Sequence, residues 1–166
     1  MQEQLGFAIA EDQVKTIPTQ YTIPVYRVSL VRDSHVTTTQ KQIRSSVDVL
    51  DLFRSMLAGV DREHFLVAML DQKNKVIGVN VVSTGSLTAS VVHPREVFKP
   101  AILSNAAALV CCHNHPSGDP TPSQEDRALT KRLVEAGKLL GIAILDHVII
   151  GDGTTSYFSF ADQGCL

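Results

Sequence analysis

The sequence predicts an α/β fold in which helices flank a mixed β-sheet. Two observations lead to this class: strand-length runs of apolar and β-branched residues recur along the chain, and segments with helical spacing of apolar residues alternate with them. The chain has 166 residues, 44% of them hydrophobic. It can therefore form one compact domain that buries about two-thirds of its unfolded surface.

The first 44 residues are expected to form an N-terminal extension. Residues 1–20 show no sustained period, which indicates a poorly ordered lead-in. Residues 26–30 alternate in the manner of a half-buried strand, and residues 36–39 are β-branched. We expect an extended arm over 1–44 and the folded domain over 45–166.

The domain is expected to begin with a helix near Ser45 or Ser46, because either hydroxyl can accept a hydrogen bond from the free amides of the first turn. Gly59 ends this helix. An apolar strand over 65–70 and a Val-rich strand over 76–83, joined by a polar turn, then predict a β-hairpin.

The second half of the domain is expected to alternate strands and helices. The predicted elements are a strand over 87–92, a short helix that begins at Pro94, a buried strand over 107–113, a long helix that Gly141 ends, and strands over 142–150 and 157–160. The expected order is α-β-β-β-α-β-α-β-β.

Composition narrows the classes of function. A net charge of −2 and a pI of about 6.3 argue against binding of nucleic acid or anionic lipid through overall charge. The longest apolar run is far shorter than the about 18 residues of a membrane span. The N-terminus lacks a signal peptide pattern, and two of the three cysteines are adjacent, which excludes a secreted disulfide framework. We expect a cytoplasmic protein with reduced thiols and no membrane association.

The residues that carry chemistry lie between positions 113 and 126. His113 and His115 stand at i and i+2 of a strand, so both rings point to one face, about 7 Å apart along the backbone. Asp126 falls in the first turn of the next helix, and a loop with three prolines can hold it opposite the strand end. Two His and one carboxylate leave the fourth position of a tetrahedral zinc ion open, which is the ligand count of a catalytic site.

A structural interpretation competes for part of this pattern, since Ser123-x-x-Asp126 before an apolar helix is also a capping box. Thr121 offers another cap: Pro122 would then be the first helical residue, and Gln124 would complete the box. That arrangement would free Ser123 and Asp126, and for the complete pattern we favour a metal site.

The spacing His-x-His, seven residues, Ser, two residues, Asp resembles the JAMM signature of the MPN-plus, or JAB, metallopeptidase-like domains. The string from His113 to Gly118, with His93-Pro94-Arg95-Glu96 before it and Asp146-His147 after it, is similar to the RadC branch of that superfamily. The resemblance covers about residues 45–166. It implies a cytidine-deaminase-like α/β sandwich that binds one zinc ion, and a hydrolase that in JAMM relatives cuts peptide or isopeptide bonds.

The resemblance also implies an upstream glutamate as the catalytic base, and Glu63 and Glu96 are the two candidates. We favour Glu63, because a carboxylate that enters an apolar strand can be held in a partly dry site suited to proton transfer at neutral pH. In the implied mechanism the two histidines and Asp126 hold zinc, which activates water. Glu63 moves the proton, and Ser123 donates a hydrogen bond to the developing oxyanion.

Two further polar residues, Cys111 and His147, have alternative interpretations. Cys111 shares the strand face of His113 and is a rival ligand, but a single ion would have to reach along about 13 Å of strand, so a buried core thiol is favoured. His147 lies in a buried strand and is either a support for the zinc ligands or a hydrogen-bonded core histidine.

The main alternative function is that of a DNA-repair or mobile-element-associated RadC-like protein. Longer RadC proteins carry a helix-hairpin-helix region associated with DNA, and residues 1–44 lack its Gly-rich pattern, so we expect a short member with the JAB domain alone. Nucleobase deaminases of the same fold use Pro-Cys-x-x-Cys, which this sequence lacks. With no tryptophan and no basic stripe, direct nucleic-acid binding is disfavoured.

A binding module that keeps the fold without the metal is a second alternative, and the intact ligand set argues against it. A peptide or protein substrate is the expected partner, and a homodimer is a further option.

Overall fold

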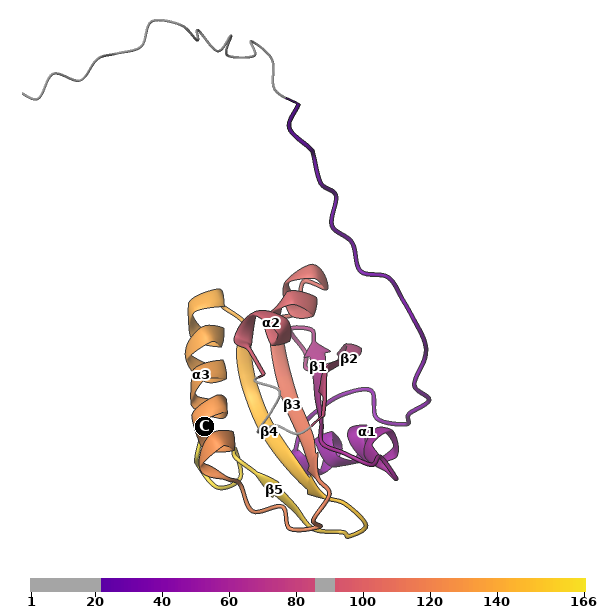
Figure 1. Cartoon of the computed structure of the whole chain (residues 1–166), viewed down its shortest axis with the longest axis vertical. Helices are drawn as coiled ribbons and strands as arrows, with labels where there is room; N and C mark the ends of the chain where they lie inside the picture. The colour runs from indigo at the N-terminus through magenta and orange to yellow at the C-terminus, as the bar shows by residue number, and fades with distance from the viewer. Residues whose placement is uncertain (1–21, 86–91) are drawn as a thin grey trace, which may run out of the picture.

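The structure is a computed structural model that describes residues 22–85 and 92–166. Its elements, in chain order, are α1 (Ser46–Leu57), β1 (His64–Leu70), β2 (Val76–Thr84), α2 (Pro94–Leu103), β3 (Ala108–His115), α3 (Gln124–Leu140), β4 (Ala143–Gly151) and β5 (Tyr157–Ser159). The strands form a sheet of order β2-β1-β3-β4-β5, in which β3 and β4 are parallel and the other pairs antiparallel (Figure 1). The predicted α/β class with a mixed sheet is confirmed.

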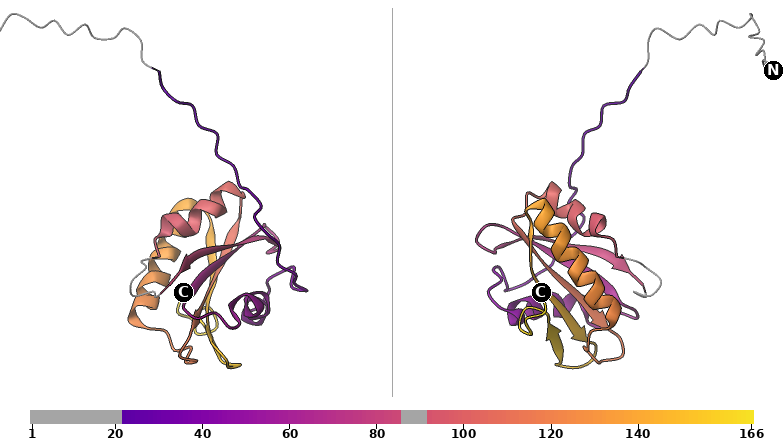
Figure 2. Two further views of the ribbon diagram at one scale, coloured as in Figure 1. Left: turned by 45° about the vertical axis from the view of Figure 1, so that its right-hand side comes forward. Right: turned by 90° about the vertical axis from the view of Figure 1, so that its left-hand side faces the viewer.

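Helices cover both faces of the sheet. Helix α1 lies on one face, and α2 and α3 lie on the other, as the left view of Figure 2 shows. Alternate residues of β1 supply the two cores: Leu66 and Leu70 belong to the core under α1, and Phe65 and Val67 to the core under α2 and α3. A strand buried on both faces explains the nearly continuous apolar run in the sequence.

Local sequence signals place the first two helices. Of the two predicted caps, Ser45 and Ser46, Ser45 caps α1, and it forms a capping box with Asp48. Pro94 stands at the start of α2, where its missing amide leaves no hydrogen bond unmade. Across 22–85 and 92–166, no helix is long and apolar enough to cross a membrane.

The strand expected over 26–30 is wrong. Tyr26 and Val28 are 82% and 71% exposed, and this segment has no regular secondary structure. From residue 22 onward, the chain first pairs with the sheet region at Gln42, which forms an isolated bridge with Lys75, the residue before β2. The alternation is present in the sequence, but a strand also requires a partner for its backbone, and the described part of the arm extends away from the domain (Figure 1). The expectations for residues 1–20 and for nearly all of 87–92 lie outside the described residues.

Candidate metal centre

The carboxyl end of β3 and the N-terminus of α3 lie at the same end of the domain (Figure 1). His113 and His115 lie at the carboxyl end of β3. The strand extends to His115 rather than stopping at residue 113 as predicted. Asp126 lies in the first turn of α3 and is only 3% exposed. Strand alternation and the short loop between the two elements thus direct three potential ligands to one point.

The three side chains converge closely. His113 Nε2 lies 3.3 Å from Asp126 Oδ1, His115 Nε2 lies 3.5 Å from Asp126 Oδ2, and the two Nε2 atoms are 3.1 Å apart. One potential ligand atom from each residue lies within 4.8 Å of the other two. This His-His-Asp group could hold a metal ion.

The hydrogen bonds around the group have a defined direction. His115 Nδ1 lies 2.7 Å from the carbonyl oxygen of Asp119, so this nitrogen carries a proton and donates it. In a neutral His115, Nε2 is then a bare lone pair that points toward His113 and Asp126. Asp126 Oδ2 accepts hydrogen bonds from the Ser123 backbone N–H and hydroxyl, at 2.8 and 2.6 Å, and Oδ1 faces His113.

The electrostatics of the group favour a cation. Burial lowers the pKa of His113, so this ring prefers to be neutral. The hydrogen bond with Asp126 raises the pKa of His115. Burial alone would raise the pKa of Asp126, but the two facing rings and Ser123 together hold that pKa well below its usual range. The carboxylate is therefore ionised and faces two ring nitrogens across a short gap.

Glu63 is the upstream glutamate that the structure brings to this group. Glu63, His115, Ser123 and Asp126 help to line a cavity of about 250 Å³. Glu96, the other candidate base, instead forms ion pairs on α2, at 2.7 Å with Lys99 and 3.4 Å with Arg95.

Asn114 fixes the backbone on both sides of Glu63. Its Oδ1 accepts a hydrogen bond from the His64 backbone N–H at 2.8 Å, and its Nδ2 donates to the Arg62 carbonyl at 3.1 Å. The Glu63 carbonyl in turn accepts from the Gly85 N–H at 2.9 Å. Because side chains alternate across a strand, Asn114 lies on the face opposite the two histidines and anchors the segment that carries the glutamate.

The capping prediction for α3 needs correction. Ser123, not Thr121, is the N-cap: its hydroxyl accepts from the Asp126 N–H at 3.1 Å, and Asp126 Oδ2 accepts from the Ser123 N–H. Two capping boxes are available in the sequence, and the one that forms also turns the Asp126 carboxylate toward His113 and His115. Asp126 therefore caps and faces the histidines at once, so the two interpretations do not exclude each other.

His147 stands directly behind His113. Its Nε2 lies 2.8 Å from His113 Nδ1, and its Nδ1 lies 2.7 Å from Thr130 Oγ1. Burial lowers the pKa of His147 well below its usual value, so the ring is neutral. Of the two interpretations of His147, the contacts favour the one in which it supports the potential ligand His113.

Cys111 lies away from the group of three and inside the core under α2 and α3. Burial raises the pKa of its thiol, which keeps the sulfur protonated and poorly suited to bind a metal. The favoured interpretation as a core thiol fits this position.

Sequence reasoning missed Asn114 and Thr130. A signal for Asn114 existed, since an amide between two histidines on a buried strand must find partners on the opposite sheet face. Thr130 lies four residues after Asp126 and therefore on the same side of α3, which was a weaker signal.

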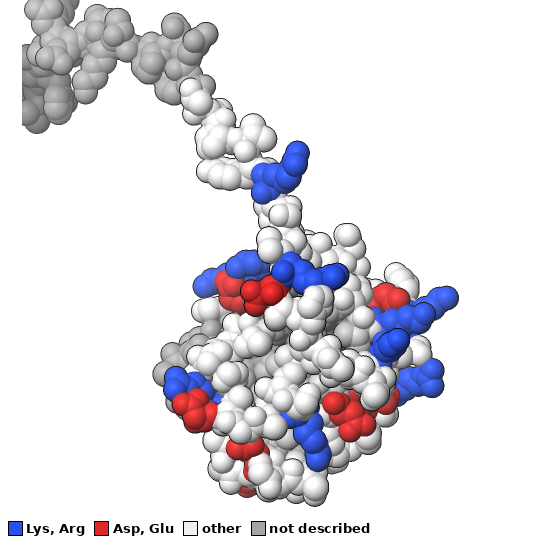
Figure 3. Space-filling model, turned by 90° about the vertical axis from the view of Figure 1, so that its right-hand side faces the viewer, with Lys and Arg blue, Asp and Glu red and all other residues white. Residues whose placement is uncertain are grey.

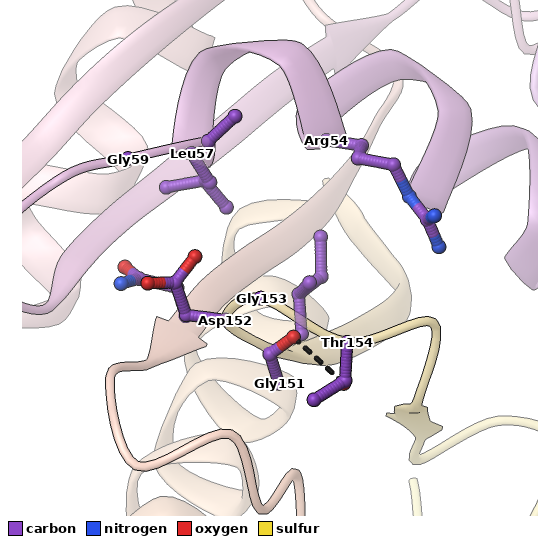
Figure 4. A pocket seen from close by; sticks show the side chains of 10 residues that line it. Arg54, Leu57, Gly59, Gly151, Asp152, Gly153 and Thr154 are labelled. Atoms are coloured by element: carbon purple, nitrogen blue, oxygen red, sulfur yellow. Dashed lines mark hydrogen bonds between the residues drawn. The ribbon is translucent and has the colours of Figure 1, made fainter.

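A second hollow of about 240 Å³ lies on the other side of Asn114, between the end of α1 and the β4–β5 turn (Figure 4). Its lining includes Arg54, Leu57 and residues 151–154. The Thr154 hydroxyl donates to the Gly151 carbonyl at 3.0 Å, so the turn satisfies its own polar groups.

Comparisons with known proteins identify the family of this chain. Residues 43–165 match the family model described as "RadC-like JAB domain". A UPF0758 protein of Rubrobacter xylanophilus is 53% identical over 124 residues, which cover 75% of this chain and 53% of that protein. A UPF0758 protein of Methanosarcina mazei is 47% identical over 140 residues, covering 84% and 60%. The chain spans about half the length of the curated relatives it matches. The family model covers most of the chain, and the chain belongs to the RadC-like JAB domain family.

Proposed function

We propose that this domain is a zinc-dependent hydrolase of the JAMM type that cleaves a peptide or isopeptide bond. One observation carries the proposal: His113 Nε2, His115 Nε2 and the ionised Asp126 carboxylate converge on one point at the wall of a cavity. When neither Nε2 atom carries a proton, the three groups face one another as hydrogen-bond acceptors, and a cation among them stabilises this arrangement.

The donor set fits zinc. Imidazole nitrogen and carboxylate oxygen are both common zinc ligands, and three protein ligands leave one position of a tetrahedral ion open. His113, His115 and Asp126 would hold the ion. When bound, zinc would supply Lewis-acid chemistry, which polarises a carbonyl group and makes water acidic near neutral pH.

Glu63 would move the protons of the reaction. Its place in the lining of the same cavity as His115 and Asp126 lets its carboxylate take a proton from the attacking water and return that proton to the leaving amine. An amide bond requires this second step, since an unprotonated amine anion is a very poor leaving group. Asn114 would keep the Glu63 backbone in place during both transfers.

Ser123 is the proposed donor to the oxyanion. Its hydroxyl donates to Asp126 Oδ2 at 2.6 Å, so this role requires the hydroxyl to turn from the carboxylate toward the substrate. A carboxylate that binds a cation gives up part of its electron density, which weakens that hydrogen bond and makes the turn easier.

A nucleic-acid function is the second candidate, and the face of the molecule in Figure 3 offers no support for it. On the face in Figure 3, acidic and basic side chains are interspersed rather than sorted into a basic patch. Phosphate backbones are bound by clustered Lys and Arg, because binding draws on the release of counterions.

The test combines metal analysis with a cleavage screen. Protein purified without chelator is expected to contain about one zinc ion per chain, held by three ligands, and to cleave some linear or branched peptides in a chelator-sensitive reaction. A parallel titration with labelled DNA at physiological salt is expected to give a Kd no tighter than about 10⁻⁴ M. Failure to bind any transition metal would remove the hydrolase proposal, and submicromolar DNA binding without peptide cleavage would favour the alternative.

A further inference from the structure

We infer that Thr130 and His147 are positioning residues that fix the tautomer of His113, so that its Nε2 lone pair faces the metal position. This inference rests on the proposed function, because it concerns the same three ligands. It assigns a purpose to two buried polar residues that are not themselves part of the cavity lining described above.

The geometry is a continuous chain of hydrogen bonds across three elements. Thr130 Oγ1 on α3 lies 2.7 Å from the Asp126 backbone carbonyl and 2.7 Å from His147 Nδ1 on β4. His147 Nε2 lies 2.8 Å from His113 Nδ1 on β3. Thr130 is 1% exposed, and both rings are fully buried.

The direction of this chain follows from its first member. A carbonyl oxygen only accepts, so the single hydroxyl proton of Thr130 is donated to Asp126. The hydroxyl oxygen then accepts from His147, which must carry its proton on Nδ1. In a neutral ring the other nitrogen is bare, so His147 Nε2 accepts from His113.

The last step reaches the metal position. His113 donates from Nδ1 to His147, so a neutral His113 has no proton on Nε2. That bare Nε2 lies 3.3 Å from Asp126 Oδ1 and 3.1 Å from His115 Nε2. The opposite tautomer of His113 would direct an N–H at the site and would have to lose that proton before a metal ion could bind.

The chain of hydrogen bonds begins and ends at Asp126. Its first acceptor is the backbone carbonyl of Asp126, and its last member, His113 Nε2, faces the side chain of Asp126. The first turn of α3 thus supplies a ligand and also sets the tautomer of the ligand opposite. Both functions depend on the same placement of α3 against the sheet.

Aromatic packing keeps the His147 ring in the orientation that this chain needs. The ring stacks on Phe160, with ring centroids 5.1 Å apart and an angle of 7° between the ring planes. The Phe65 ring lies beside it in a tilted arrangement, with ring centroids 5.3 Å apart. A ring held on two sides cannot turn freely to exchange its nitrogens.

A purely structural role is the competing explanation, since Thr130 and His147 also satisfy each other's polar groups. The two explanations differ in what happens when only the Thr130 hydroxyl is removed. In Thr130→Val the His147 Nδ1–H loses its acceptor, and the proton can move to Nε2. His113 Nδ1 must then accept, and its own proton moves to Nε2, where it blocks the metal position.

The experiment measures the tautomers in metal-free protein by long-range ¹H–¹⁵N correlation of the imidazole rings, and the zinc affinity by competition with a chromophoric chelator. Wild type is expected to carry the protons of His113 and His147 on Nδ1. Thr130→Val is expected to move the His113 proton to Nε2 and to lower zinc affinity about 10- to 100-fold. Thr130→Ser, which keeps the hydroxyl, is the matched control and is expected to retain the wild-type tautomers and an affinity near that of wild type.

A wild-type spectrum with the His113 proton on Nε2 overturns the inference, and this reading does not depend on whether any variant folds. Equal loss of affinity in Thr130→Ser and Thr130→Val, or unchanged affinity in Thr130→Val, overturns it as well. In all three cases the wild type still binds zinc, so the proposed function stands. Absence of zinc binding by wild type is a different result, which contradicts the proposed function itself.

Discussion

Asn114 holds the backbone on either side of Glu63. The buried amide bonds to the Arg62 carbonyl and to the His64 N–H, one residue to either side of the glutamate. Since Asn114 also stands between His113 and His115, one three-residue stretch of β3 carries two candidate ligands and the anchor of the candidate base. The separation between base and ligands is therefore set by the pairing of β1 with β3.

Asn114→Ala is expected to separate catalysis from metal binding. The variant loses two buried hydrogen bonds, which costs about 1–3 kcal/mol of stability. It should keep its zinc but lose turnover, by about a hundredfold if Glu63 moves by about 1 Å. Zinc content, denaturant midpoint and turnover measured on one preparation check this, and loss of zinc in parallel with turnover would contradict the assignment.

Glu63→Gln is expected to retain zinc and lose hydrolysis, because an amide preserves shape but cannot accept the proton. Glu96→Gln is the matched control. Its side chain is 43% exposed and pairs with Lys99 and Arg95, so the change should leave turnover close to wild type. Steady-state rates on one peptide substrate decide between them, and an inactive Glu96→Gln beside an active Glu63→Gln would reverse the assignment of the base.

Ser123→Ala is expected to affect both stability and rate. The variant loses the N-cap of α3, which costs about 1 kcal/mol of folding free energy. If the hydroxyl also serves the oxyanion, turnover falls by about a hundredfold beyond any loss of folded protein. Rates measured well below the unfolding temperature separate the effects, and a destabilised variant with wild-type turnover would leave Ser123 only its role as a cap.

Much of the fold could be predicted because its signals are local. The apolar run at β1 and the helical spacing in α3 each lie within one element, and the histidine pair needs only the two-residue period of a strand. The strand expected over 26–30 failed because its sequence pattern says nothing about a partner. The sequence could not decide between Thr121 and Ser123 as the cap of α3. The contact that favours Ser123, between Asp126 and the two histidines, joins α3 to β3 and forms only in the folded protein.

The support behind the ligands was out of reach for the same reason. His147 meets His113 only because β3 and β4 pair in parallel with His147 opposite Cys111 and Ile149 opposite His113. The register of two strands separated by a helix is a tertiary property, and neither strand contains a signal for it. The sequence could offer His147 as a candidate support. Only the strand pairing shows that its Nε2 contacts Nδ1 of His113.

The metal-free protein is expected to lose stability as the pH falls. Burial lowers the pKa values of His113 and His147. Below about pH 6.5 these two residues therefore bind protons in the unfolded chain but not in the folded protein. His115 acts in the opposite sense, because its pKa is raised and its contribution is lost as the pH rises. The two effects fall in different pH ranges. Below about pH 6.5 His115 is protonated in both states, so His113 and His147 together give a net uptake on unfolding of up to about two protons, or at most about 2.7 kcal/mol per pH unit.

Denaturant midpoints of chelator-treated protein at about pH 7.5 and about pH 5.5 test this slope. The exposed His35 lies on the arm, so His35→Ala is the matched control and should keep the wild-type slope. Zinc should raise the midpoint at the higher pH and lose this effect at the lower one, since protons compete with the ion for the ring nitrogens. A midpoint that rises on acidification would mean that His115 dominates, and that His113 and His147 are not held neutral by their burial.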